Sequence, residues 1–185
     1  MPSSDVLRSL LSTQLNATVA RRSPDEILQE VPPAARGVQP EGLPEAYSLW
    51  QILEHVRICQ ADYFQFCTDA EYTPPTWPDD YWPDAVAPPS DDAWTQSLNQ
   101  FQHDRQSILE FVNDPSIDLT AEIPHAAELK EGNAFVDDIH GLTCAEQFAT
   151  IADHNAYHLG QFVTVRRLLG VWPPEHMEAP DWGVS

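Results

Sequence analysis

Residues 143–170, TCAEQFATIADHNAYHLGQFVTVRRLLG, contain the strongest helical pattern in the chain and decide its predicted fold. Thr143 and Glu146 have the spacing of a capping box, in which the two side chains satisfy free backbone N–H groups at the start of a helix. Gly170 can cap the C-terminal end, and the prolines at 173 and 174 prevent the helix from continuing. The pattern therefore predicts a helix from about residue 143 to residue 169.

Three other stretches carry apolar residues at steps of three and four, the spacing of one buried helical face. They cover about residues 5–19, 44–66 and 91–113, and the sequence Ser-Pro-Asp-Glu at 23–26 adds a short helical turn. Together these segments predict an all-α protein, a four-helix bundle formed by a single domain over residues 1–185.

The connections between the predicted helices are long. Residues 68–90 contain six prolines and two tryptophans, so they are expected to form an ordered crossover rather than a tight turn. Residues 116–142 show no clear period, although alternating apolar residues at 117, 119 and 123 allow a brief extended piece. A long connection between the middle helices favours a bundle with a crossover over simple up-down-up-down order.

Composition limits the possible partners and location of the protein. Its 29 acidic and 9 basic side chains give a formal net charge of −20, which repels nucleic acid and anionic membranes. No run approaches the roughly 20 apolar residues of a membrane span, and the N-terminus lacks the pattern of a signal peptide. Three cysteines without a CxxC pair indicate free thiols, and a cytoplasmic location is expected.

Two histidines in the last predicted helix, His154 and His158, lie four residues apart, so their imidazoles can reach the same ion. The spacing alone is common by chance, but both lie mid-helix in an apolar stretch, where unpaired imidazoles are costly to bury. His55 lies beside the buried stripe of the second predicted helix, and helical bundles build metal sites from facing helices. The three histidines thus predict a site for one divalent ion, zinc or nickel, with an open fourth position.

Residues near these histidines have two interpretations each. Cys59 can reach a metal as a thiolate, but a small buried side chain is the favoured interpretation. Asp62 can orient an imidazole, although a solvated or salt-bridged carboxylate is favoured. Gln161 can hydrogen-bond at the site or simply pack within the bundle, and Trp77 and Trp82 can line a pocket mouth. The remaining histidines are interpreted as surface or loop residues: His103, His125, His140 and His176.

Three segments resemble a known family. The stretches 154–161 (HNAYHLGQ) and 166–173 (RRLLGVWP) resemble the last helix of the DinB-like superfamily, and 49–55 (LWQILEH) resembles its second helix. The resemblance implies a four-helix bundle, often a homodimer, with a three-histidine metal site at His55, His154 and His158. Residues 125–142 depart from the family pattern.

The resemblance also implies a class of activity. Characterised members include metal-dependent enzymes that use a low-molecular-weight thiol as transferases or isomerases. We therefore expect a metal-dependent enzyme acting on a small molecule, with thiol transfer, isomerisation or hydrolysis as its chemistry. The alternatives are a non-catalytic metal-binding stress-response or scaffold protein, and a bundle whose histidines no longer bind metal.

The charge balance yields the first prediction. The protein should not bind duplex DNA at physiological salt, because too few Lys and Arg side chains are present to displace counterions from the phosphates. Fluorescence anisotropy with a labelled duplex checks this. Submicromolar binding that weakens as salt is added would contradict it.

Overall fold

The computed structural model describes residues 4–16, 22–43, 46–124, 126 and 143–174 of the chain. Its helices are α1 (Ser4–Asn16), α2 (Pro24–Leu28), the 3₁₀ turn η2 (Pro33–Ala35), α3 (Leu49–Thr68), α4 (Asp91–Asn113) and α7 (Cys144–Leu168). The described residues form no strand, only an isolated bridge between Glu122 and Thr143, so the predicted all-α class is confirmed. None of the described helices is both long and apolar enough to cross a membrane.

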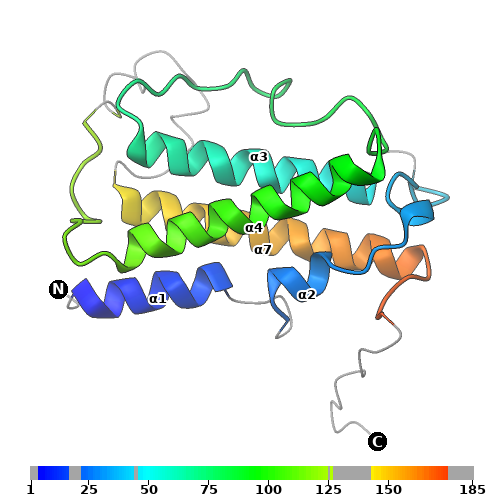
Figure 1. Ribbon diagram of the computed structural model, residues 1–185, viewed down its shortest axis with the longest axis horizontal. Helices are drawn as coiled ribbons and strands as arrows, with labels where there is room; N and C mark the ends of the chain where they lie inside the picture. The colour runs from blue at the N-terminus through cyan, green and yellow to red at the C-terminus, as the bar shows by residue number, and fades with distance from the viewer. Residues whose placement is uncertain (1–3, 17–21, 44–45, 125, 127–142, 175–185) are drawn as a thin grey trace, which may run out of the picture.

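The four long helices lie against one another along their sides. Helix α3 contacts α7 and α4, and α1 contacts both α7 and α4. Figure 1 shows α3 and α4 running in the same direction while α1 and α7 run the opposite way. Because α3 and α4 are parallel, the chain between them returns along the length of α3, as the crossover prediction requires.

Helices α2, α3, α4 and α7 each begin after a residue whose side chain accepts a hydrogen bond from a free backbone N–H of the first turn. The predicted capping box at Thr143 is present, with Thr143 Oγ1 accepting from the Glu146 backbone N–H and Glu146 accepting in return. Helix α7 ends at Leu168, close to the predicted limit, and Gly170 follows with a φ of 71°, which suits a residue without a β-carbon.

The start of α3 differs from the sequence prediction. A helix was expected from about residue 44, but α3 begins at Leu49. Ser48 and Gln51 form a capping box at that point, so the extended Ser48 backbone defines the helix start. The prediction missed this boundary because apolar spacing continues through Leu43 and Ala46, outside the helix. Residues 17–19, predicted to end the first helix, lie outside the described residues.

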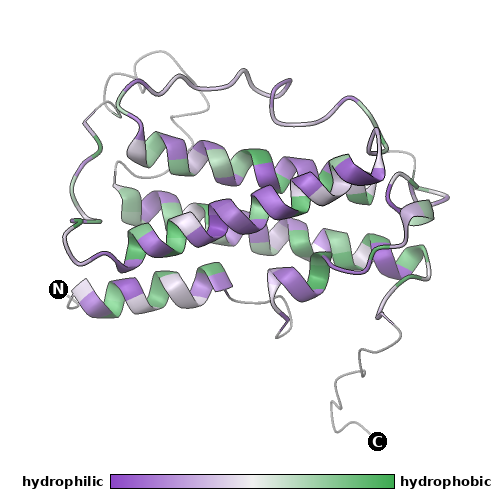
Figure 2. Ribbon diagram, in the orientation of Figure 1, coloured by the Kyte–Doolittle hydropathy of each residue, from purple (hydrophilic) through white to green (hydrophobic). Residues whose placement is uncertain are grey.

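The buried side chains of the four long helices are mainly apolar. Figure 2 shows hydrophobic and hydrophilic residues alternating along each of these helices. Phe148 and Ile151 of α7 are fully buried in one core cluster, with Ile108 of α4. Phe162 of α7 and Leu53 of α3 belong to a second cluster, which also covers α2. Helix α7 thus contributes to both clusters along its length.

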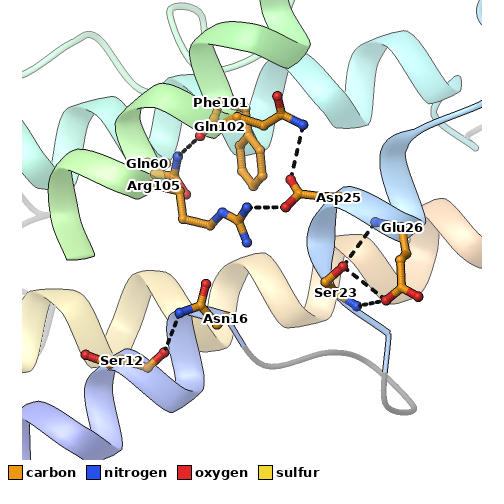
Figure 3. Close-up of polar contacts among 9 residues, drawn as sticks. All are labelled: Ser12, Asn16, Ser23, Asp25, Glu26, Gln60, Phe101, Gln102 and Arg105. Carbon is orange, nitrogen blue, oxygen red and sulfur yellow. Dashed lines mark hydrogen bonds and ion pairs between the residues drawn. The ribbon is translucent and has the colours of Figure 1, made fainter. Parts of the chain in front are cut away.

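The short helix α2 is held in place by polar contacts. Asp25 accepts a hydrogen bond from Arg105 Nη2 at 2.6 Å and one from Gln102 Nε2 at 3.1 Å, which joins α2 to α4 (Figure 3). Arg105 interrupts the apolar spacing of α4, and its ion pair with Asp25 accounts for a charged side chain at this position. Ser23 and Glu26 form a capping box at the start of α2, visible in the same view.

Arg166 joins α7 to α2 from inside the protein. Its fully buried guanidinium donates to the carbonyl oxygens of Ile27 at 2.7 Å, Gln29 at 3.0 Å and Glu30 at 3.2 Å. It also lies 4.7 Å from the ring centroid of Trp172. Burial lowers the pKa of Arg166 to about 10, which still leaves it charged at neutral pH.

Replacing this side chain tests its structural role. Arg166→Met should destabilise the protein by about 3 kcal/mol, since several buried carbonyl oxygens lose their donor. Arg167→Met is the matched control, because the neighbouring Arg167 is exposed. Urea unfolding followed by circular dichroism measures both variants, and equal midpoints would contradict the role given to Arg166.

Candidate metal centre

The three predicted ligand residues come from two antiparallel helices. His55 lies in the first half of α3, and His154 and His158 lie one turn apart in α7. The ring centroid of His55 lies 5.0 Å from that of His154 and 4.5 Å from that of His158, and the two α7 rings are 4.5 Å apart. Residues separated by about a hundred positions in sequence are therefore in direct contact.

Hydrogen bonds orient two of the three rings. His55 Nδ1 lies 2.9 Å from the carbonyl oxygen of Tyr81, which can only accept, so Nδ1 carries the proton. His158 Nδ1 lies 2.8 Å from Gln161 Oε1 and donates in the same way. In a neutral imidazole this leaves Nε2 with a free lone pair, the form in which histidine binds metals. Gln161 thus hydrogen-bonds at the site.

Burial keeps these rings neutral. It lowers the pKa of His55 to about 4 and that of His154 to about 3, and it also lowers the pKa of His158. Charge on one ring would repel charge on the others, which adds to the shift for His55 and His154. Each imidazole can therefore donate a lone pair at neutral pH without first losing a proton.

The donor geometry fits a divalent ion. His55 Nε2 and His154 Nε2 lie 3.1 Å apart. Two nitrogens bound to one tetrahedral zinc, each at about 2.0–2.1 Å, lie roughly 3.3 Å from each other. In addition, His154 Nδ1 is buried without a hydrogen-bond partner among the described residues. No such bond therefore orients the His154 ring, whereas the Tyr81 carbonyl orients the ring of His55.

Cys59 lies next to the histidines, one turn beyond His55 in α3. Donor atoms from His55, Cys59 and His154 all lie within 4.8 Å of one another, a group that could hold a metal ion. The sulfur lies 3.6 Å from Nδ1 and 3.8 Å from Nε2 of His55, so it packs over the ring rather than beyond Nε2. Burial raises the pKa of the Cys59 thiol, and the side chain is buried as predicted. The ligand group that includes Cys59 keeps the thiolate interpretation open.

Asp62 supports the site indirectly, through hydrogen bonds with two tyrosine hydroxyls. The favoured interpretation of a solvated or salt-bridged carboxylate is wrong: Asp62 is buried and accepts hydrogen bonds from the hydroxyls of Tyr72 at 2.6 Å and Tyr81 at 2.7 Å. Burial raises the pKa of Asp62, and the two hydroxyl donors oppose that rise. Because the Tyr81 carbonyl holds His55, Asp62 orients the imidazole through Tyr81 rather than directly.

The crossover between α3 and α4 covers the site. Trp82 stacks on the His55 ring with centroids 3.7 Å apart and an interplanar angle of 7°, and Tyr47 stacks on Trp82 at 3.9 Å. Trp77, the other predicted pocket residue, is about half exposed and packs against Tyr81 instead. Sequence reasoning did not identify Tyr81, because its contribution to His55 is a backbone carbonyl, which no residue type signals.

The other histidines are separate from this cluster or lie outside the described residues. His103 is exposed on α4, beside Asp104, as predicted for a surface histidine. His125, His140 and His176 lie outside the residues that the structure describes.

The structure is an all-α protein in which two buried histidines and one half-buried histidine, all neutral, meet between two helices at a potential metal site. Within this class, the chain belongs to the DinB superfamily, whose family model matches residues 13–162. The match includes His55, His154 and His158. No curated protein and no solved structure matches the chain.

The lowered histidine pKa values predict a pH dependence of stability for the metal-free protein. In the unfolded chain the same histidines titrate near 6.5, so as pH falls below that value the unfolded state takes up protons first. The free energy of unfolding should therefore be highest above about pH 7. It should fall from pH 6.5 towards pH 4, by at most about 1.4 kcal/mol per pH unit for each histidine.

Urea midpoints of chelator-treated protein at pH 7.5, 6.0 and 5.0, values chosen around the histidine range of roughly 6.5, measure this dependence. His154→Gln should flatten it, and His103→Gln, on the exposed face of α4, should leave it unchanged. A urea midpoint that rises as pH falls through this range would contradict the predicted loss of stability.

Proposed function

We propose that His55, His154 and His158 bind one divalent cation of the zinc or nickel type, and that the protein is a metal-dependent enzyme acting on a small molecule. The observation that carries the proposal is the 3.1 Å separation of His55 Nε2 and His154 Nε2, with the His158 ring in contact with both histidines. The net charge of −20 favours cations near the protein surface.

The chain's own residues prepare the site for the ion. Tyr81 and Gln161 hold protons on Nδ1 of His55 and His158, so both Nε2 lone pairs are available. Trp82 covers one side of His55 and excludes water from it. A bound divalent cation supplies Lewis acidity and lowers the pKa of a coordinated water or thiol.

The class of reaction rests on the family. Family resemblance favours a low-molecular-weight thiol as co-substrate, in transferase or isomerase chemistry. Asp62 is committed to two tyrosine hydroxyls, so we do not assign it the role of general base. The tyrosines Tyr47 and Tyr157, both exposed beside Trp82 and His158, offer apolar contact area to a bound small molecule.

One observation favours the second candidate, a non-catalytic metal-binding protein. Cys59 lies beside His55 and belongs to the same possible ligand group. If its side chain turned towards the ion, four protein donors would close the coordination sphere, as in structural zinc sites. In that case the ion would only tie α3 to α7.

Metal analysis tests the proposed ligands. The purified protein should bind about one equivalent of Zn²⁺, and His55→Ala, His154→Ala and His158→Ala should each weaken binding more than tenfold, about 1.4 kcal/mol or more. Removing one of three donors leaves too few to hold the ion. His103→Ala is the control and should keep full metal content. Equal metal content in all four variants would contradict the proposal.

Cobalt substitution distinguishes the two functions. Co²⁺-loaded protein with an open position should acquire a thiolate-to-metal charge-transfer band when a low-molecular-weight thiol is added. If Cys59 closes the site, the band should be present without added thiol and absent in Cys59→Ser. The first result favours the enzyme, and the second favours the non-catalytic protein.

A further inference from the structure

Two of the three cysteines meet at one end of the same helix pair. Cys67 lies in the last turn of α3, and Cys144 is the first residue of α7. The Cys144 sulfur lies 3.8 Å from the carbonyl oxygen of Cys67. The contact follows from the antiparallel packing of α3 and α7, which brings the end of one helix to the start of the other.

This pair is separate from the histidine cluster. Cys67 is 12 residues beyond His55 in α3, which corresponds to about 18 Å along a helix. Cys144 is 10 residues before His154 in α7, or about 15 Å. The third cysteine, Cys59, packs on His55 and takes no part in the pair.

The two thiols differ in their surroundings. Cys144 occupies the first turn of α7, where free backbone N–H groups stabilise a thiolate. A hydrogen bond with Cys67 lowers the pKa of Cys144, and the same hydrogen bond, together with burial, raises the pKa of Cys67. The position of Cys144 at the helix start favours it as the thiolate and nucleophile of the pair, with Cys67 holding the proton. Cys144 is buried and Cys67 is half-buried. Both are free thiols.

We propose that Cys67 and Cys144 form a redox-active dithiol, which a low-molecular-weight disulfide oxidises to an intramolecular disulfide between the end of α3 and the start of α7. Sequence spacing does not indicate such a pair, because the two cysteines lie 77 positions apart and form no CxxC motif.

The reaction balances as two thiol–disulfide exchanges. The Cys144 thiolate attacks one sulfur of the small disulfide, forms a mixed disulfide and releases one small thiolate. Cys67 gives its proton to that thiolate, and its own sulfur then attacks the Cys144 sulfur. The bond to the small thiol breaks, and a second thiolate leaves. The two cysteines lose two electrons in total, and the small disulfide gains them.

The product would join the two helices that carry the histidines. In the reduced protein, α3 and α7 are held together by noncovalent packing alone across the ends where Cys67 and Cys144 meet. A covalent link there would restrict separation of α3 from α7 and raise the midpoint of thermal unfolding, since it closes a long loop in the unfolded chain. This inference does not depend on whether the histidines bind metal.

Thiol counting and peptide mapping test the proposal on the full-length protein. The reduced chain is incubated with oxidised glutathione, quenched with acid, alkylated and digested with a protease that cleaves after aromatic residues. Cleavage at Tyr63, Phe64 or Phe66 separates Cys59 from Cys67. We expect free thiols to fall from three to one per chain, with the Cys67 and Cys144 peptides linked and Cys59 alkylated.

Single substitutions provide the matched controls. Cys59→Ser should still form the link, whereas Cys67→Ser and Cys144→Ser should stop at a mixed disulfide or remain reduced. Circular dichroism of each variant establishes that it is folded. The wild-type map is sufficient even if a variant fails to fold. Three free thiols after oxidation, a link that includes Cys59, or links only between separate chains would overturn the proposal.

Discussion

The antiparallel packing of α3 against α7 is the contact on which both the fold and the site depend. It brings His55 beside His154 and His158 near the middle of the helices, and Cys67 beside Cys144 at one end. Burial in this interface also keeps the histidines neutral, since a charged imidazole would lose its hydration there. A shift of one helical turn between α3 and α7 would move His55 by about 5.4 Å and separate the rings.

The crossover between α3 and α4 completes the site. Because α3 and α4 run parallel, the chain must return along α3. On the way, Tyr81 and Trp82 of this segment contact His55. Asp62 anchors this return through the hydroxyls of Tyr72 and Tyr81, and the Tyr81 carbonyl then fixes the proton of His55. A buried carboxylate is costly unless it is hydrogen-bonded, so this arrangement ties the position of the crossover to the orientation of one imidazole.

Helices were predictable where local signals agreed with each other. In α7 the capping box, the apolar spacing and Gly170 all indicated the same limits, and the structure has them. In α3 apolar spacing extended beyond the helix, and the Ser48–Gln51 capping box was overlooked. Asp62 was misjudged for a related reason: its helical position was visible in the sequence, but the tyrosines that bury it belong to the crossover.

The sequence by itself determined the helical class, the family resemblance and the closeness of His154 to His158, because four residues on one helix have a set geometry. Only the tertiary structure decided what faces that pair. The contact with His55, the Tyr81 carbonyl, the stacked Trp82 and the meeting of Cys67 with Cys144 all join segments distant in sequence. Such contacts follow from how the helices pack and where the crossover runs, and neither is encoded in the spacing of residues along one helix.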